Sequence, residues 1–445
     1  MSAETQDRYI ETKAQLSRLF QSVEASLNGE SSHPFHAFRR QAMDKLQDLS
    51  FPTRRDEDWK YTSLNRLLVN EYGHQAAPKL EEGQLAPFVI GGEEVIQLVF
   101  VNGTWNKELS RLSAKPDFLV VMELKHALAD PQYKTLIEAE WTQWALASDS
   151  ALVAMNMAFA QSGLFVHIPA NKVLENPIHC IHIHTKTDKP QLTSPQMFVV
   201  AGKSSQLTVV DSFVSLDADA VYFSNIVNRF VLEPNAVVYH YKLQNEALEA
   251  FQINHTEALV KRDGNFSSFV LDLGGRIVRN NISAFLGDSG THTNLFGVYL
   301  GKGEQHIDSQ TFIDHAFPHC TSNELYKGIL TDRANGVFNG KVMVHKDAQK
   351  TNAYQQNSSL VLSERAQMDT KPQLEIFADD VRCSHGATIG QLDESSVFYL
   401  KSRGFNDEQA RSMLQHAFLI EVLEHIHLDE VREKAEALVF AKFDS

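Results

Sequence analysis

The residues best suited to chemistry lie in one short run near the C-terminus, Asp379–Gly386 (DDVRCSHG). Thiolate and imidazole are good ligands for iron or zinc. In an extended segment, the side chains of Cys383 and His385 project to the same side, because successive residues alternate. The neighbouring Arg382 is expected to lower the pKa of the thiol. Two ligands do not complete a metal site, so a partner chain or sulfide must supply the rest. The alternative is a buried cysteine beside a hydrogen-bonded histidine.

Two further clusters contain residue types that bind metals. The first is the run His179–His184 (HCIHIH), in which His182 and His184 share a strand face with Cys180. The second mixes several spacings and consists of His306, Asp308, His315, His319 and Cys320. For both clusters the sequence leaves a metal site and a purely structural role open.

Composition excludes several classes of protein. The chain has 445 residues, of which 43% are hydrophobic and 22% charged, as in a globular chain of several domains. A net charge of −15 gives no electrostatic basis for binding nucleic acid or an anionic membrane. The three cysteines (Cys180, Cys320 and Cys383) are scattered and odd in number, which argues against a disulfide framework and favours the reduced cytoplasm. We expect no signal peptide and no membrane span, because no long apolar run occurs.

Motifs for nucleotide binding and for hydrolysis by serine or zinc enzymes are also absent from the sequence. There is no phosphate-binding P-loop, no complete dinucleotide fingerprint around Gly301–Gly303, no nucleophile elbow and no zinc-protease helix. We therefore expect that this chain binds no nucleotide, and that any ATP hydrolysis comes from a partner.

Mainly helical patterns precede these candidates along the first third of the chain. Apolar residues recur three or four apart in Thr5–Leu27 and His36–Leu49, with a Gly/Ser break at Asn28–Ser32. A connecting segment with Trp59, Tyr61 and Leu64 is expected to be anchored on the helical domain by these residues, and a partner surface is the alternative. The remaining elements predicted here are a strand at Val95–Asn102 and helices at Leu124–Asp130, Tyr133–Ala147 and Ala151–Gln161.

From about Gly163 to Asp380, short runs rich in Val, Ile, Phe and Tyr alternate with Gly, Asn and Asp, which indicates many strands. A sandwich and a solenoid both fit this pattern. Asparagines near the turns, such as Asn294 and Asn323, would suit stacked coils, but no exact repeat decides between the two. The predicted strands include Leu164–Ile168, Ile178–His184, Met197–Val200, Leu207–Val214, Ala236–Tyr241, Phe266–Leu271, Ile277–Phe285, Leu295–Leu300 and Gly336–His345.

The C-terminus returns to a helical pattern. Asp393 can cap the start of one helix, and Gly404 suits the position just past its end. Asn406 and Gln409 have the spacing of a capping box for a second helix. The stretch Ala410–Ile426 is mostly apolar on one side, so we expect it to pack against its own domain or a partner.

Two motifs resemble the SufB/SufD family of iron–sulfur cluster assembly scaffold proteins. The run Asp379–Asp393 (DDVRCSHGATIGQLD) and its continuation Phe398–Gly404 (FYLKSRG) resemble the C-terminal signature of the family, and Arg55–Leu64 (RDEDWKYTSL) resembles its SufD branch. The resemblance implies a mainly β fold, with a right-handed parallel β-helix between an N-terminal and a C-terminal helical domain. The expected domains are residues 1–160, 161–380 and 381–445.

The resemblance further implies a non-catalytic scaffold subunit of a SufBCD-type complex. By position, Cys383 and His385 match residues that acquire iron or hold a transient iron–sulfur cluster shared with SufB across an interface. The β-helix is expected to meet the SufB paralogue. The C-terminal helices, from Asp393 to about His427, are expected to dock SufC, an ABC-type ATPase. A homodimer is a further option.

Two alternatives stay open. A SufB-type paralogue shares much of the signature, although the low cysteine count and the Trp-Lys-Tyr-Thr block favour the SufD branch. A β-helical carbohydrate-active enzyme would use acidic residues such as Asp272, Asp308 and Asp314, two of which would face one groove about 5–9.5 Å apart.

Overall fold

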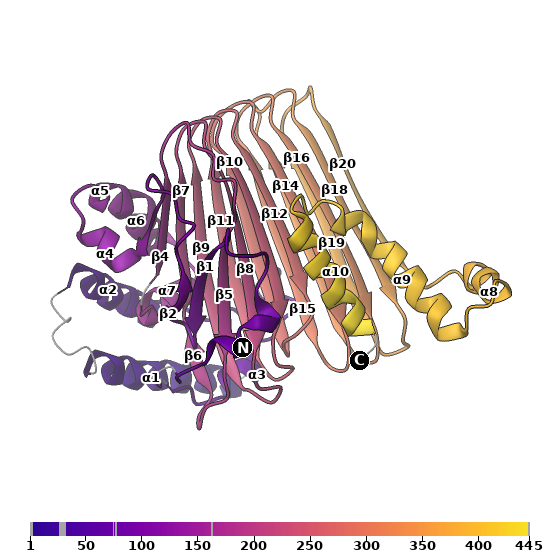
Figure 1. Cartoon of the computed structure of the whole chain (residues 1–445), viewed down its shortest axis with the longest axis horizontal. Coiled ribbons are helices and arrows are strands. Elements are labelled where there is room, and N and C mark those ends of the chain that lie inside the picture. Colours follow the sequence, from indigo (N-terminus) through magenta and orange to yellow (C-terminus); the bar gives the residue numbers. More distant parts are fainter. Residues whose placement is uncertain (1–2, 26–32, 74, 76–77, 162, 444–445) are drawn as a thin grey trace.

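Strands dominate the structure, a computed structural model that describes residues 3–25, 33–73, 75, 78–161 and 163–443 (Figure 1). From β8 onward, successive strands fall alternately into two sheets, and every strand pairs in parallel with the strand two places along the chain. Each coil therefore gives one strand to each sheet. This is a parallel β-helix, and the prediction of a mainly β fold with flanking helices is confirmed.

The two sheets are called sheet 1 and sheet 2. In spatial order, sheet 1 contains β2 (Thr104–Arg111), β1 (Ile96–Val101), β5 (Ile178–His184), β8 (Gln206–Ser215), β10 (Val237–Asn245), β12 (Asn265–Asp272), β14 (His292–Gly301), β16 (Thr321–Leu330), β18 (Asn352–Val361) and β20 (Arg382–Gly390). Sheet 2 contains β19 (Gln367–Ile376), β17 (Asn335–Val344), β15 (His306–His315), β13 (Ile277–Leu286), β11 (Phe251–Val260), β9 (Tyr222–Leu232), β7 (Gln196–Ala201), β4 (Leu164–Ile168) and β3 (Val120–Glu123), with β6 (Gln191–Thr193) beside β9.

The interior between the sheets is partly apolar and partly polar. A continuous apolar core fills it from β1 to β18, with side chains such as Val238, Phe266 and Phe338. Some of the polar side chains that point inward pair with one another. Lys242 Nζ lies 2.8 Å from Asp272 Oδ1 and 2.8 Å from Asn280 Oδ1. Such buried groups must be paired, because an isolated buried charge is strongly destabilising.

Helices from the first third of the chain cover the outer face of sheet 2. A second core joins their apolar sides to that face. The predicted helices Thr5–Leu27 and His36–Leu49 are confirmed over the described residues, which exclude the last two residues of the first helix and the predicted break at Asn28–Ser32. The helices are α1 (Ala3–Ala25), α2 (Pro34–Asp48), α3 (Asn65–Leu68), α4 (Leu124–Ala129), α5 (Lys134–Ile137), α6 (Gln143–Ala147) and α7 (Ala151–Phe159), with short helical turns at Glu57–Trp59, Glu82–Gln84, Ala86–Phe88 and Glu138–Thr142.

The connecting segment around Trp59 is anchored on the helical domain, as expected, and also on sheet 2. Trp59 and Leu64 join the core that the helices share with the outer face of sheet 2. The guanidinium of Arg279 lies 3.7 Å from the centre of the Trp59 ring. Thr62 donates a hydrogen bond to Asp308, which also pairs with Arg279. The segment therefore fastens the N-terminal region to the outer face of the β-helix through buried polar contacts.

The C-terminal helices are α8 (Glu394–Ser402), α9 (Asp407–Leu423) and α10 (Asp429–Phe443). The predicted caps are confirmed. Asp393 accepts from two backbone amides, Gly404 has a φ of 99°, and Asn406 and Gln409 form a capping box. The later turns of α9 and all of α10 pack on the outer face of sheet 1, whereas α8 projects away from the body (Figure 1). No helix in the described part of the chain is long and apolar enough to cross a membrane.

Strands extend beyond the limits expected for the β-helix on both sides. β1, β2 and β3 lie within residues 1–160, and β20 lies within residues 381–445. The division into three domains at those boundaries stays a prediction. For the site, the important consequence is that the candidate ligand run is a strand of the β-helix and not part of the helical region after it.

Candidate functional site

The candidate ligand run forms the last strand of sheet 1. β20 pairs in parallel with β18, and no other strand of the described residues pairs with its opposite edge. β19 ends sheet 2 in the same way. The β-helix therefore ends in two strands whose outer backbone groups are available for pairing with another chain.

Cys383 and His385 lie on the same face of β20, and their register places them toward the interior of the β-helix. Their partners on β18 are Ala353 and Gln355, which are both buried. Cys383 packs against the interior core and is half-buried. His385 is exposed, because no further coil covers it. The structure thus brings the two candidate ligands together at the open end, where metal binding stays a prediction.

The environment of Cys383 favours the protonated thiol. Burial raises its pKa, and a hydrogen bond with the backbone of Ala353 only partly opposes that shift. The expectation that Arg382 lowers this pKa is wrong. Arg382 is exposed and on the opposite face of the strand, so water screens its charge while the thiol is partly desolvated. The thiol therefore has to lose a proton before it can bind a metal.

The pair alone does not provide enough ligands for a metal site. No three His, Cys, Asp or Glu side chains of the described residues gather closely enough to hold a metal ion. Iron–sulfur clusters are generally held by more protein ligands than one thiol and one imidazole. Cys383 and His385 can thus contribute to a site only together with ligands from another chain or with sulfide.

A polar row, which the sequence analysis did not single out, leads from the interior to His385. Glu324 on β16, Gln355 on β18 and His385 on β20 are consecutive register partners. Gln355 donates from Nε2 to Glu324 Oε1 at 3.0 Å, and its own Oε1 has no partner. Thr311 donates to the other carboxyl oxygen of Glu324. Burial raises the pKa of Glu324 to about 7, despite these bonds.

Glu324 should make the stability of the fold depend on pH. Its folded pKa of about 7 lies above the ordinary 4.5, so between these values only the unfolded state loses the proton. Stability is therefore lost as the pH rises through this window, by about 3 kcal/mol for a shift of this size. We expect Glu324→Gln to gain stability relative to the native chain over that range. Urea unfolding at pH 4.5 and pH 7.5 measures the change.

Glu364→Gln serves as the matched control, because it removes the same charge from an exposed turn. Its free energy of unfolding should differ from that of the native chain by a small amount that is nearly independent of pH. A pH-independent difference for Glu324→Gln would contradict the raised pKa.

The histidines of β5 are buried and hydrogen-bonded. Burial lowers the pKa of His179 and of His184 to about 3, so both rings are neutral. Burial also raises the pKa of the Cys180 thiol well above its usual range. The ring nitrogens of the three histidines lie within hydrogen-bonding distance of neighbouring side chains: His179 lies 2.8 Å from Ser212, His182 lies 3.4 Å from Asp211, and His184 lies 3.2 Å from Thr193. These contacts favour the structural role for the run His179–His184.

The third cluster does not converge on one point. Asp308 points to the outer face of sheet 2, where it pairs with Arg279. His315 lies 2.9 Å from Ser322 in the interior, and Cys320 is buried. His306 and Asp308 both contact the Thr62 hydroxyl, whereas His315 and Cys320 lie in the interior. The described residues therefore bring no three members of this cluster together as metal ligands.

The acidic residues of the carbohydrate-enzyme alternative are separated in the same way. Asp272 is buried against Lys242 inside the β-helix, and Asp308 pairs with Arg279 on the outer face. Asp314 lies 2.7 Å from His345 and is engaged there. The three carboxylates are each held by a cationic or imidazole partner and do not form an acid–base pair across one groove.

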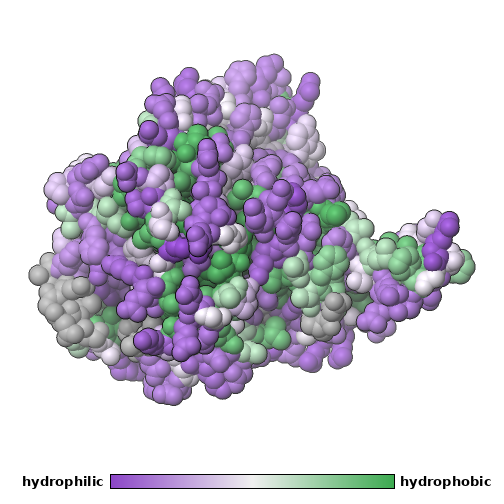
Figure 2. All heavy atoms as spheres, viewed as in Figure 1, coloured by the Kyte–Doolittle hydropathy of each residue, from purple (hydrophilic) through white to green (hydrophobic). Residues whose placement is uncertain are grey.

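The projecting C-terminal arm, residues 394–413, carries exposed apolar side chains. Phe398 is 74% exposed and Tyr399 is 55% exposed, and Phe405 and Met413 add to the same arm. Figure 2 shows apolar surface on this projection. Large exposed apolar groups of this density mark contact surfaces in soluble proteins.

Two regions of the chain, which together cover most of it, match known protein families. Residues 182–418 match the family described as "SUF system FeS cluster assembly, SufBD core domain", and residues 10–180 match "SufBD protein N-terminal region". An iron–sulfur cluster assembly SufBD family protein of Synechocystis sp. is 32% identical over 90% of this chain and 89% of its own length. Iron–sulfur cluster assembly protein SufD of Escherichia coli is 29% identical (90% and 92% covered). SufD of Bacillus subtilis is 26% identical (91% and 93% covered).

Proposed function

This chain belongs to the SufBD family of iron–sulfur cluster assembly proteins, and from that membership we propose that it is a SufD-type scaffold subunit. In this role it assembles with a SufB-type paralogue and a SufC-type ATPase in the cytoplasm. The observation that carries the proposal is the placement of Cys383 and His385 on the last strand of sheet 1, whose outer edge pairs with no other strand of the described residues. Two ligands at an open edge suit a site that a second chain completes.

The end of the β-helix is suited to pair with another β-helix. The unpaired edges of β19 and β20 offer backbone donors and acceptors. Apolar side chains gather around them: Phe377 is 62% exposed, and Ile376, Ile389 and Tyr354 are exposed as well. Pairing with a second chain would remove this apolar surface from water. It would also cover His385, and so place the ligand pair inside the interface.

In this role the chain contributes two side chains that bind the cargo, one of which must lose a proton to do so. Iron and sulfide are cargo in this scheme. The Cys383 thiol gives up its proton when it binds iron, which makes binding favourable at higher pH. The imidazole of His385 offers a ring nitrogen on the same face of the strand. The interior row from Glu324 through Gln355 gives His385 a polar neighbour rather than an apolar wall.

The C-terminal arm supplies the contact with the ATPase. Its exposed apolar side chains offer a surface for a partner, and α9 links the arm to the outer face of sheet 1. Movement of a bound ATPase would therefore be passed to the end of the β-helix that carries β20. Such a switch requires that nucleotide-bound ATPase prefers one arrangement of the interface over another.

Anaerobic co-purification from the native host tests the proposal. We expect recovery of an ABC-type ATPase and a paralogous β-helix chain together with this chain. Recovery of this chain alone or as a homodimer, at native abundance and without either partner, would contradict the scaffold role. An ATPase recovered without a paralogue would contradict the shared interface.

A further inference from the structure

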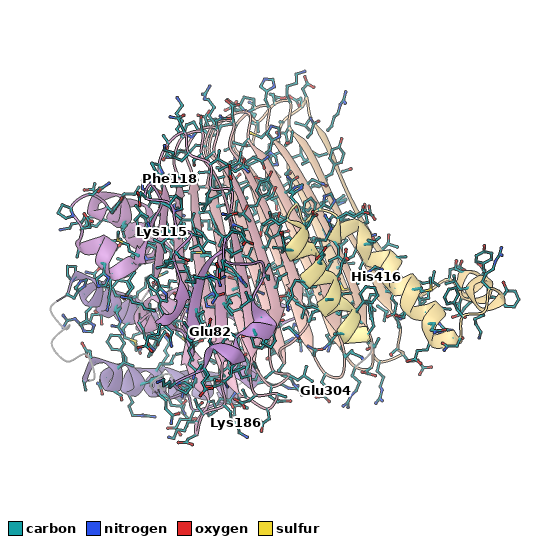
Figure 3. All side chains as sticks on the ribbon, viewed as in Figure 1. Glu82, Lys115, Phe118, Lys186, Glu304 and His416 are labelled. Carbon is teal, nitrogen blue, oxygen red and sulfur yellow. The ribbon has the colours of Figure 1, made fainter. Side chains whose placement is uncertain are left out.

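An open cavity of about 700 Å³ lies where the N-terminal connecting segment crosses the turns that lead into sheet 2. Arg54, Tyr61 and Arg66 line it from the segment, and Arg276, Glu304 and Arg333 line it from the turns before β13, β15 and β17. We call these six residues the arginine pocket. Figure 3 labels Glu304 at the lower edge of the β-helix, and Asp369 on β19, the last strand of sheet 2, also lines the cavity. The proposed scaffold function does not involve the arginine pocket.

The charges of the pocket do not balance. Four guanidinium groups line it, against the carboxylates of Glu304 and Asp369. Glu304 alone contacts three of the four: Arg276 directly, Arg333 at 2.6 Å and Arg66 at 3.6 Å. From the rim, Glu249 lies 3.6 Å from Arg276. Even with that carboxylate counted, positive charge is in excess, in a chain whose net charge is −15.

The guanidinium groups also keep unused hydrogen-bonding capacity. Each carries five N–H donors in a planar fork, and one carboxylate has two oxygens to receive donors from three such forks. The Nε of Arg54 donates to the backbone oxygen of Lys60 at 3.0 Å, which holds this arginine at the edge of the cavity. The side chains of Arg66 and Arg333 are 61% and 55% exposed, so water and solutes reach them.

We propose that the arginine pocket binds a small phosphate-bearing anion. Guanidinium forks match phosphate oxygens in bidentate pairs, and a phosphate group carries more charge than the single carboxylate now shared among them. The cavity exceeds the size of one phosphate group, and the Tyr61 ring lines part of it, which favours a phosphate ester over the free ion. In the absence of the ligand, the Glu304 carboxylate pairs with the arginines, so the phosphate group competes with Glu304 for them.

Isothermal titration of the full chain with pyrophosphate at low salt tests this site. We expect saturable binding that weakens as salt is added. Arg333→Gln and Arg66→Gln should each weaken it about tenfold, the effect of losing one charge-assisted hydrogen bond. Glu304→Gln should have the opposite effect and tighten binding, because it frees three guanidinium groups. Arg262→Gln is the matched control, since this exposed arginine pairs with Asp288 outside the pocket.

Three results would overturn the proposal. The first is the absence of saturable binding to the native chain. The second is a loss of binding in Glu304→Gln equal to that in Arg333→Gln, because a purely structural ion-pair cluster is weakened by removal of either sign. Arg54→Gln gives a readout that does not depend on the turns, since this residue lies on the connecting segment. If pyrophosphate binds to both Arg54→Gln and Arg66→Gln as tightly as to the native chain, the pocket is excluded as the binding site.

Discussion

Replacing Cys383 with serine, or His385 with alanine, is expected to lower the iron–sulfur cluster recovered with the complex by about tenfold or more. Loss of a group that only orients a metal ligand already costs 10–100-fold in metal affinity, so loss of a ligand should cost at least as much. Neither change should disturb folding, because Cys383 is half-buried at the end of the core and His385 is exposed. Iron and acid-labile sulfide per complex, measured after anaerobic reconstitution, give the result.

Ser384→Ala is the matched control, since it lies on the same strand but on the opposite face. It should retain the full cluster yield, and all three variants should still form the complex on size-exclusion chromatography. Full yield from both Cys383→Ser and His385→Ala would refute the site. A yield that falls only because the complex fails to form would instead show that these residues stabilise the interface.

The ligand pair could be found from the sequence because its signal is local. Cys383 and His385 are two residues apart, and a strand places such residues on one face whatever surrounds it. The caps at Asp393 and Asn406 were predictable for the same reason, since each depends on residues within three positions. The Arg382 expectation failed because the pKa of a thiol depends on burial, which comes from coils distant in sequence.

The polar row behind His385 could not be predicted, because it depends on the register of separate coils. The successive partners Leu295, Glu324, Gln355 and His385 are spaced 29, 31 and 30 residues apart. A coil length that varies by one or two residues leaves no exact repeat in the sequence. The choice between sandwich and solenoid was undecided for this reason, even though the in-register pair Asn294 and Asn323 was among the residues that suggested stacking.

The arginine pocket was hidden from the sequence in the same way. Arg54 and Arg66 lie far from Arg276 and Arg333 along the chain, and only the crossing of the connecting segment over the turns brings them together. An acidic chain gives no hint of a basic pocket, because net charge averages over the whole surface. The segment Arg55–Leu64 was singled out only for its resemblance and its aromatic residues.

The second large effect is expected in the C-terminal arm, where Phe398→Asp should weaken docking of the ATPase about 30-fold or more. Phe398 is 74% exposed, so the free chain loses little when it is replaced. In a docked complex the aromatic ring would be buried, and truncating a central aromatic contact typically costs about 2 kcal/mol or more. Binding of the purified ATPase, followed by titration calorimetry, measures the change. The melting temperature of the variant should match that of the native chain.

Val69→Asp is the matched control, because Val69 is 63% exposed and lies in the N-terminal region, away from the arm. It adds the same charge and should leave ATPase affinity unchanged. Equal affinity for the native chain and Phe398→Asp would exclude the arm as the docking surface. The two sets of variants also separate the two halves of the proposed function. Cys383→Ser should dock the ATPase but hold much less cluster. Phe398→Asp should keep the ligand pair at the paralogue interface but lose its link to nucleotide hydrolysis.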